Sequence, residues 1–241
     1  MPPYAEVIGD PIAHSKSPAI HNFWLKQLGI AADYRATRVT DLEAYFEARR
    51  RDPDWRGCNV TAPHKQAVIP FLDEASPIGA VNCIVRDGDR LIGLNTDVDG
   101  VHAALVGADL SRVVLIGAGG AAMAVRAALA DAGELVGITR QNIDRTELLA
   151  GATLIVNATP LGMRDGDPLP IDVDRIAPGS YVGDVILKAD MTPFLQAAKD
   201  KGCTIQVGTD MLFEMIPAYL EFFGFATTTP DNLRAIAQIR Y

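Results

Sequence analysis

Hydroxyl, amide and charged side chains in the first part of the chain fall at the expected ends of strands and starts of helices. The candidates are Ser15, Ser17, Asn59, Thr61, Lys65, Asn82, Asn95, Thr96 and Asp97. Each residue taken singly is compatible with a helix-capping or turn role. For Ser17, taken by itself, that role is the favoured interpretation. Their occurrence in several clusters instead predicts a pocket, because small hydroxyl and amide groups hydrogen-bond a hydroxylated, anionic small molecule.

A second pattern, later in the chain, indicates a dinucleotide site. The apolar run Val113–Ile116 is followed at once by Gly117-Ala118-Gly119-Gly120-Ala121 and an alanine-rich segment. Gly117 permits a tight turn, Gly119 lets backbone N–H groups approach a pyrophosphate, and the small Ala122 allows close helix–sheet packing. A strand expected over 134–139 completes the βαβ unit. The alternative is a purely structural glycine loop.

The end of that second strand indicates which dinucleotide binds. An NAD site usually places Asp or Glu about 20 residues after the glycine turn, where it accepts hydrogen bonds from the ribose. The corresponding residues are Thr139, Arg140 and Gln141, which include no carboxylate. Arg140 offers a planar cation for a 2′-phosphate, Thr139 a hydroxyl donor, and Arg145 a candidate second cation. NADP is therefore favoured over NAD; the alternative is that Arg140 is a solvated loop residue.

Composition and charge limit the kinds of partner. The formal net charge of −8 repels nucleic acid and anionic lipid, so an anionic ligand must be held by local donors. The three cysteines lack metal-ligand or CxxC spacing, so we expect reduced packing residues and no metal site. We see neither a signal sequence nor an apolar run of membrane-spanning length, and we expect a cytoplasmic monomer or homodimer.

Hydrophobic periodicity predicts alternating strands and helices along the whole chain. Strands are expected at 4–9, 34–39, 57–61, 80–86, 90–94, 113–116, 134–139, 152–156, 181–185 and 204–207. Helices are expected at 17–28, 42–50, from Pro63, at 98–106, from about 120, and at 193–201, 211–223 and 230–239. Ser17 before Pro18 is a helix-start signal, and Asp87-Gly88-Asp89 predicts a β-hairpin.

These elements predict an α/β fold with two domains. Residues 1–98 form an N-terminal α/β substrate domain, on which the helices of 209–241 pack back. Residues 99–208 form a Rossmann-type NADP-binding domain with a parallel sheet. The active site is expected in the cleft between the two domains.

The clustered motifs also resemble those of the shikimate dehydrogenase family, over almost the full chain. The family's G-x-P-x-x-H-S-x-S-P-x-x-H-N, N-V-T-x-P-x-K, G-A-V-N and G-x-N-T-D-x-x-G correspond to Gly9–Asn22, Asn59–Lys65, Gly79–Asn82 and Gly93–Gly100. Its G-A-G-G-A and N-A-T-P-x-G-M correspond to Gly117–Ala121 and Asn157–Met163. Several motifs in the same order make a chance resemblance very improbable.

The resemblance implies reversible NADP-linked reduction of 3-dehydroshikimate to shikimate, in the biosynthesis of chorismate and the aromatic amino acids. Lys65 and Asp97 look like the family's catalytic pair, which exchanges the proton of the substrate hydroxyl. By resemblance, Ser15 and Ser17 hold the substrate carboxylate, whereas the ring hydroxyls are surrounded by Asn59, Thr61, Asn82 and Asp97. The cofactor residues implied are Gly117, Ala118, Gly119, Gly120, Ala121, Thr139, Arg140, Asn157, Ala158, Thr159, Met163, Val185, Gly208 and Met211, with Met163 near the nicotinamide.

Two substrate-site positions depart from the family pattern. The family's D-x-x-Y is Asp184–Leu187, and its G-x-x-M-L-x-x-Q is Gly208–Met215, so Leu187 and Met215 replace a tyrosine and a glutamine. Each lost hydrogen bond costs about 0.5–1.5 kcal/mol, which together weakens shikimate binding roughly 10- to 100-fold. One alternative is therefore a divergent oxidoreductase for a related ring acid, such as quinate or aminoshikimate. Another is a low-turnover NADP(H)-binding regulatory module, against which the intact Lys65 and Asp97 count.

Overall fold

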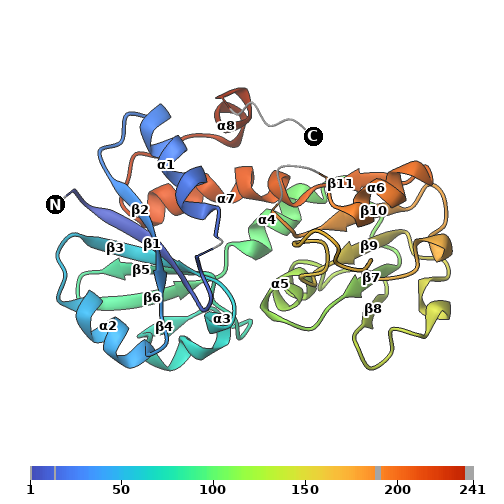
Figure 1. Ribbon diagram of the computed structural model, residues 1–241, viewed down its shortest axis with the longest axis horizontal. Helices are drawn as coiled ribbons and strands as arrows, with labels where there is room; N and C mark the ends of the chain where they lie inside the picture. Colours follow the sequence, from blue (N-terminus) through green and yellow to red (C-terminus); the bar gives the residue numbers. More distant parts are fainter. Residues whose placement is uncertain (1, 14, 188–190, 237–241) are drawn as a thin grey trace. The chain divides into compact units, whose positions relative to one another are not determined.

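The computed structural model describes residues 2–13, 15–187 and 191–236; His14 and the end of the expected C-terminal segment, 237–241, lie outside the described residues. The chain divides into two compact units (Figure 1). Unit 1 comprises the described residues up to Thr96 and from Ile216 onward, and unit 2 runs from Asp97 to Met215. Helix α7 (Gly208–Phe222) is therefore divided between the two units, with its last residues in unit 1.

Unit 1 is built on a mixed six-stranded sheet, sheet A, with the strand order β2-β1-β3-β5-β6-β4. Its strands are β1 (Tyr4–Gly9), β2 (Asp33–Arg38), β3 (Trp55–Val60), β4 (Glu74–Ala75), β5 (Cys83–Asp87) and β6 (Arg90–Leu94). Strand β1 pairs in parallel with β2 and β3, whereas β5 runs antiparallel to β3 and β6. The predicted hairpin is confirmed, and Gly88 in its turn has a φ of 60°, which glycine adopts without strain.

Helices cover both faces of sheet A. They are α1 (Ser17–Gln27), α2 (Leu42–Arg50), α3 (His64–Ala67), the last part of α7 and α8 (Pro230–Ile236), with a 3₁₀ turn η1 (Ile69–Phe71). Helices α1 and α7 lie on one face and α2 and α3 on the other (Figure 1). The chain directly after α7 packs on β3, since a Cβ on Gly57 would lie 2.9 Å from the Phe223 ring.

Glu6 in β1 is a fully buried carboxylate that the sequence analysis did not single out. One of its oxygens accepts hydrogen bonds from Arg49 Nε at 2.6 Å and from the Tyr45 hydroxyl at 2.7 Å. The other oxygen accepts from the Thr37 hydroxyl. Burying a carboxylate is tolerated only when such donors and an opposite charge offset its desolvation. Glu6 thereby connects β1 with β2 and α2.

Unit 2 contains a parallel five-stranded sheet, sheet B, with the order β11-β10-β9-β7-β8. Its strands are β7 (Val113–Ile116), β8 (Leu135–Ile138), β9 (Leu154–Asn157), β10 (Tyr181–Asp184) and β11 (Thr204–Gln206). The remaining elements are α4 (Asp97–Ala104), α5 (Gly120–Ala128), α6 (Pro193–Asp200), the first part of α7, and the 3₁₀ turns η2 (Thr146–Leu149) and η3 (Val173–Arg175). The predicted α/β fold with a Rossmann-type parallel sheet is confirmed.

Sheet B has one strand fewer than a complete Rossmann sheet. The Rossmann strand order is 3-2-1-4-5-6, and β8, β7, β9, β10 and β11 correspond to strands 2, 1, 4, 5 and 6. Only residues 139–153 connect β8 to β9, and the regular structure within them is η2. This connection is too short for the helix and strand that would supply strand 3. Within the described residues, β8 is therefore an edge strand.

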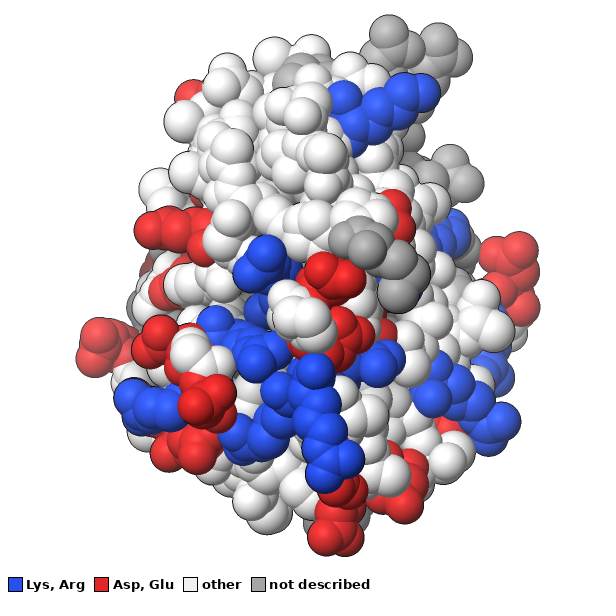
Figure 2. All heavy atoms as spheres, turned by 90° about the vertical axis from the view of Figure 1, so that its left-hand side faces the viewer, with Lys and Arg blue, Asp and Glu red and all other residues white. Residues whose placement is uncertain are grey.

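Charged side chains of both signs are interspersed on the face shown in Figure 2. In unit 1, ion pairs join Arg38 to Asp10, Arg50 to Asp73 and Arg90 to Glu74. Exposed pairs of this kind contribute only about 0–1 kcal/mol to stability, but they neutralise charge locally. Across the described ranges, none of the helices combines the length and the hydrophobicity needed to cross a membrane.

Candidate active site

The carboxyl ends of β1 and β3 bring the first candidate residues together in unit 1. Asn59 is buried within β3, and Thr61, directly after that strand, donates its backbone N–H to the Ile8 carbonyl oxygen at 3.0 Å. Gly9, the last residue of β1, lies close to this segment, since a Cβ there would be 2.8 Å from Thr61 Cγ2. A larger residue at position 9 would therefore displace Thr61.

Asn82 connects most segments of this polar cluster, and it is only 4% exposed. Its backbone carbonyl accepts from the Val60 N–H at 2.8 Å, and its own N–H donates to the Leu94 carbonyl at 3.0 Å. Its side-chain Nδ2 donates to Thr96 Oγ1 at 3.0 Å and to the Tyr219 hydroxyl at 3.2 Å. Its Oδ1 accepts from the Thr96 N–H at 2.9 Å. Asn82 is thus bound to β3, to β6, to the residue before α4 and to α7.

Lys65 and Asp97 are both connected to the Asn82 segment. The backbone carbonyl of Lys65, in α3, accepts from the Val81 N–H at 2.8 Å, next to Asn82 in the chain. Asp97 begins α4 directly after Thr96, which Asn82 binds. Both side chains are half-buried and interact with other groups of the protein. Lys65 belongs to unit 1, and Asp97 is the first residue of unit 2.

Ser15 and Ser17 lie at the start of α1 and are half-buried. The Ser15 hydroxyl oxygen accepts from the Ser17 N–H at 3.3 Å. The sequence-based interpretation of Ser17 as the helix cap is wrong: Lys16 occupies the cap position, without a side-chain hydrogen bond, and Ser17 is already helical. The reason is that the chain enters the helical conformation one residue earlier than the serine–proline signal indicates. Ser17 therefore does not use its hydroxyl as the helix N-cap.

Three ring residues that the sequence analysis did not single out surround Asn59 and Asn82. The Tyr34 hydroxyl donates to Asn59 Oδ1 at 2.6 Å, and the Tyr34 ring stacks on His21 at 4.1 Å between centroids. Tyr219, which binds Asn82, lies 5.8 Å from the His21 ring. Burial lowers the pKa of His21 to about 4, so its imidazole is neutral at physiological pH. Tyr34 and Tyr219 carry no local signal, because their contacts join residues 25 and 137 positions apart.

In unit 2, the glycine turn after β7 has the geometry that a pyrophosphate requires. Gly117 has a φ of 124°, and a Cβ there would lie 2.9 Å from the Ala158 carbonyl oxygen, so only glycine fits. A Cβ on Gly119 would meet nothing within 4 Å. Ala118 and Gly119 are exposed, and Gly120 and Ala121 begin α5. The first N–H groups of α5 are therefore accessible to an anion.

Asn157 in β9 and Asp184 in β10 form a buried network at the carboxyl edge of sheet B. Asp184 Oδ1 accepts from Asn157 Nδ2 at 3.3 Å and from the Ile186 N–H at 3.0 Å, and Oδ2 accepts from the Thr192 hydroxyl at 2.9 Å. Asn157 Oδ1 accepts from the Thr159 N–H and hydroxyl at 3.0 and 2.7 Å. Burial raises the pKa of Asp184 to about 6, although its three donors act in the opposite direction.

The residues expected to read the ribose follow β8. Thr139 is half-buried and donates its backbone N–H to Asn142 Oδ1 at 2.6 Å, whereas Arg140 is exposed. Arg145, the candidate second cation, instead forms an exposed ion pair with Glu147 at 2.8 Å. The structure therefore leaves Arg140 as the cation of this turn.

The other expected cofactor residues lie along the same edge of sheet B or on α7. The Val185 N–H donates to the Asn157 carbonyl at 3.1 Å, and Gly208 lies against the Ile186 carbonyl, where a Cβ would collide. Met163 is 52% exposed, and Met211 is buried. A side chain at position 208 would thus push α7 away from the end of β10.

The two positions that depart from the family pattern have different surroundings. Leu187 is 43% exposed and directly precedes the undescribed residues 188–190. Met215 is buried against α4, since a Cβ on Gly100 would lie 2.9 Å from Met215 Cγ and Sδ. Met215 thus packs on the helix that begins with Asp97.

Sheet B, the glycine turn and the accessible start of α5 define a Rossmann-type dinucleotide-binding protein. The profile described as "Shikimate dehydrogenase substrate binding domain" matches residues 7–84. The shikimate dehydrogenase (NADP(+)) of Sphingopyxis alaskensis is 41% identical, with 97% of this chain and 96% of the relative covered. The chain belongs to the shikimate dehydrogenase family.

Solved structures extend the similarity to the whole fold. Shikimate 5-dehydrogenase from Thermus thermophilus, in complex with NADP(H) and shikimate, is 32% identical with a TM-score of 0.84, covering 97% of each chain. Quinate dehydrogenase from Corynebacterium glutamicum, in complex with NAD, is 29% identical with a TM-score of 0.82, covering 97% of this chain and 98% of that chain. The alignment with the Sphingopyxis relative spans 265 positions, so that relative has segments which this 241-residue chain lacks.

Replacing Asp184 by asparagine should change how stability depends on pH. Because the folded pKa of about 6 lies above the ordinary value of 3.8, the contribution of Asp184 is fully present below about pH 4 and is lost as pH rises through 6. Between pH 5 and pH 7.5 this loss amounts to about 1 kcal/mol of the free energy of unfolding. Asp184→Asn cannot ionise, so urea unfolding at the two pH values should show a smaller decrease than wild type. Asp131→Asn, at an exposed site, should retain the wild-type decrease; equal pH dependence in Asp184→Asn and wild type would contradict the assignment.

Proposed function

We propose that the chain catalyses the reversible NADP-linked interconversion of shikimate and 3-dehydroshikimate. The observation that carries this proposal is the Asn82 network, which connects the segments of Asn59, Lys65 and Asp97 through hydrogen bonds. The family membership and the NADP(+)-dependent relatives support the same reaction. This function places the chain in the biosynthesis of aromatic amino acids.

In the proposed mechanism, Lys65 and Asp97 bind the hydroxyl group of shikimate that becomes a ketone. As the hydride leaves the carbon atom, this hydroxyl must lose its proton, which the pair accepts and passes to solvent. In the reverse direction the pair returns the proton to the carbonyl oxygen. Ser15 and Ser17 bind the ring carboxylate, and Asn59, Thr61 and Asn82 orient the ring hydroxyls.

The proposed cofactor is NADP(H), whose nicotinamide accepts or supplies the hydride. The residues present fit this group, because Gly117 and Gly119 leave the backbone bare at the start of α5. Arg140 would bind the 2′-phosphate, and Thr139 would donate a hydrogen bond beside it. Residues 157–159, held by Asp184, line the remaining part of the dinucleotide site together with Met163, Val185 and Met211 in this proposal.

A second candidate function is oxidation of a related ring acid, such as quinate or aminoshikimate, by the same pair. Leu187 and Met215 favour it, since neither can hydrogen-bond a ring hydroxyl as the family's tyrosine and glutamine do. The fold similarity to a quinate dehydrogenase is consistent with such a change of substrate. Initial rates with shikimate, quinate and aminoshikimate, each with NADP and NAD, distinguish the two functions.

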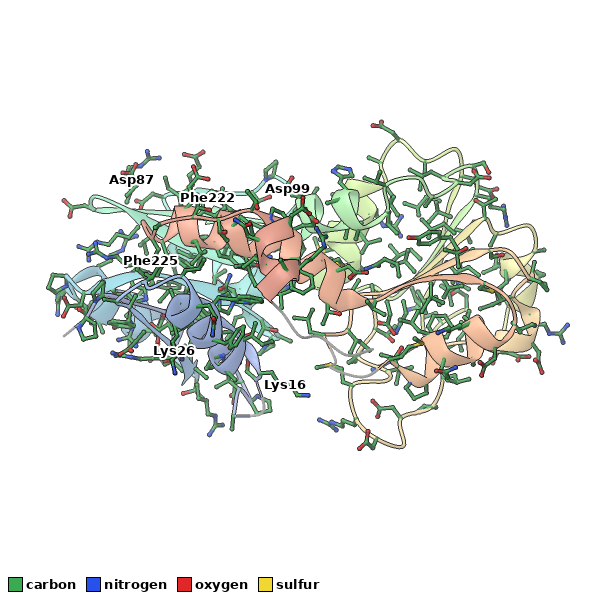
Figure 3. All side chains as sticks on the ribbon, turned by 90° about the horizontal axis from the view of Figure 1, so that it is seen from above. Lys16, Lys26, Asp87, Asp99, Phe222 and Phe225 are labelled. Atoms are coloured by element: carbon green, nitrogen blue, oxygen red, sulfur yellow. The ribbon has the colours of Figure 1, made fainter. Side chains whose placement is uncertain are left out.

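Lys65→Ala and Asp97→Asn should each lower kcat for shikimate oxidation at least about 100-fold, as expected for general acid–base groups. NADP affinity should stay within about twofold in both, because neither residue is placed at the dinucleotide in this proposal. Lys26→Ala and Asp99→Asn are matched controls on exposed parts of α1 and α4 (Figure 3). Wild-type turnover in either of the first two variants would remove the proposed proton relay.

Arg140→Ala should weaken NADP binding roughly 10- to 100-fold, since a charged hydrogen bond to phosphate contributes about 1.5–3 kcal/mol. NAD lacks the 2′-phosphate, so its affinity should change little. Calorimetric titration of both cofactors measures the difference, with Arg175→Ala as an exposed control in unit 2. Equal losses for NADP and NAD would show that Arg140 does not read the phosphate.

Restoring the family residues with Leu187→Tyr and Met215→Gln should lower KM for shikimate about 10-fold, because each supplies a hydrogen-bonding group to the ring. The two effects need not add, since both side chains would bind one ligand. Met215 is buried against Gly100, so the melting temperature of the double variant checks that glutamine is accommodated. Leu169→Tyr places the same ring on an exposed site as a control. An unchanged KM in a folded double variant would contradict the assignment of these positions to substrate binding.

A further inference from the structure

The turn after β8 is closed by one asparagine side chain. Asn142 Oδ1 accepts from the Thr139 N–H at 2.6 Å, and Asn142 Nδ2 donates to the Gly137 carbonyl at 2.9 Å. The Asn142 backbone N–H also donates to the Thr139 carbonyl at 3.1 Å. The Thr139 hydroxyl oxygen, in turn, accepts from the Gln141 N–H at 3.3 Å. Both ends of the turn that contains Arg140 are therefore held.

Two of the three side-chain bonds of Asn142, with the Thr139 N–H and the Gly137 carbonyl, have the pattern of a neighbouring parallel strand. In a parallel ladder, one residue donates to the carbonyl before its partner residue and accepts from the N–H after it. The Asn142 amide does both around Ile138, at Gly137 and Thr139. Strand β8 is the terminal strand of sheet B, at the place where Rossmann strand 3 is missing. The amide of Asn142 thus occupies one position of the absent strand.

We propose that Asn142 is a positioning residue for NADP: its amide replaces the missing strand and holds the turn that presents Arg140 to the 2′-phosphate. The inference rests on the proposed function, in which Arg140 binds that phosphate. An exposed arginine on an unrestrained turn would lose conformational entropy on binding, and a turn held at both ends reduces that loss. Asn142 acts through Arg140 and does not need to touch the cofactor.

Asn142→Ala removes all three side-chain bonds of Asn142, including the one that Oδ1 accepts from the Thr139 hydroxyl at 3.3 Å, and leaves Arg140 in place. Its dissociation constant for NADP should rise about 10-fold, whereas that for NAD should change less than about twofold. Calorimetric titration of each dinucleotide alone measures both constants without requiring turnover. Asn232→Ala removes an exposed asparagine amide in α8 and should change neither constant. In Asn142→Ala, kcat at saturating NADP should remain near wild type while KM for NADP rises.

A double-mutant cycle separates positioning from a general structural role. In an Arg140→Ala background, Asn142→Ala should weaken NADP binding by less than about twofold further, because the group that it positions is gone. Equal losses of NADP and NAD affinity in Asn142→Ala, or losses that add fully to those of Arg140→Ala, would overturn the inference. So would unchanged NADP affinity in a variant that melts at the wild-type temperature.

The same titrations distinguish this inference from the proposed function. A wild-type chain that binds NADP and oxidises shikimate, with an Asn142→Ala variant of unchanged cofactor preference, contradicts the positioning role alone. A wild-type chain that binds no NADP overturns the proposed function and the inference together. A chain that binds NADP but oxidises a different ring acid supports the positioning role if Asn142→Ala loses the preference for NADP over NAD.

Discussion

The arrangement of the polar residues in unit 1 depends on the planar side-chain amide of Asn82. Its donor and acceptor directions are fixed by the amide plane, and they are used by Thr96 and by Tyr219 on α7. Leaving such buried partners unsatisfied costs about 1–3 kcal/mol each, so alternative arrangements of these segments are disfavoured. The position of Lys65 follows from this restraint, since its backbone carbonyl binds the N–H of Val81, the chain neighbour of Asn82. Stability and site geometry in unit 1 are thus properties of the same hydrogen bonds.

In unit 2 the polar residues are held by the carboxylate of Asp184, which costs more free energy to bury than the amide of Asn82 does. Asp184 is an acid buried where desolvation outweighs its three hydrogen bonds, yet it fixes the backbone at Asn157 and Ile186. A neutral residue in its place would cost less to bury. The carboxylate, however, accepts from several donors at once, which a single amide oxygen does less well. The end of β9 is thereby held by hydrogen bonds next to the glycine turn.

Local signals were sufficient to predict much of this structure. The glycine turn, the Asp-Gly hairpin and the parallel sheet of unit 2 were predicted because each depends on neighbouring residues or on periodicity. The buried Glu6 and the contact of Tyr219 with Asn82 were missed, because they join residues far apart in the chain. The absence of strand 3 was detectable from the short interval after β8, which the sequence analysis did not use. The roles of the site residues remain predictions.

The missing strand also affects whether two copies of the chain can pair through the edges of their sheets. An open strand edge is a template for pairing with a second chain, and natural proteins protect such edges with short strands and charges. Strand β8 has four residues, and its Gly137 leaves room for the guanidinium of Arg126, which lies 3.1 Å from where a Cβ would be. This positive charge on α5 makes the edge unfavourable for an identical strand to approach. The edge at which strand 3 is missing thus carries two of the features that protect strand edges, a short strand and a charge.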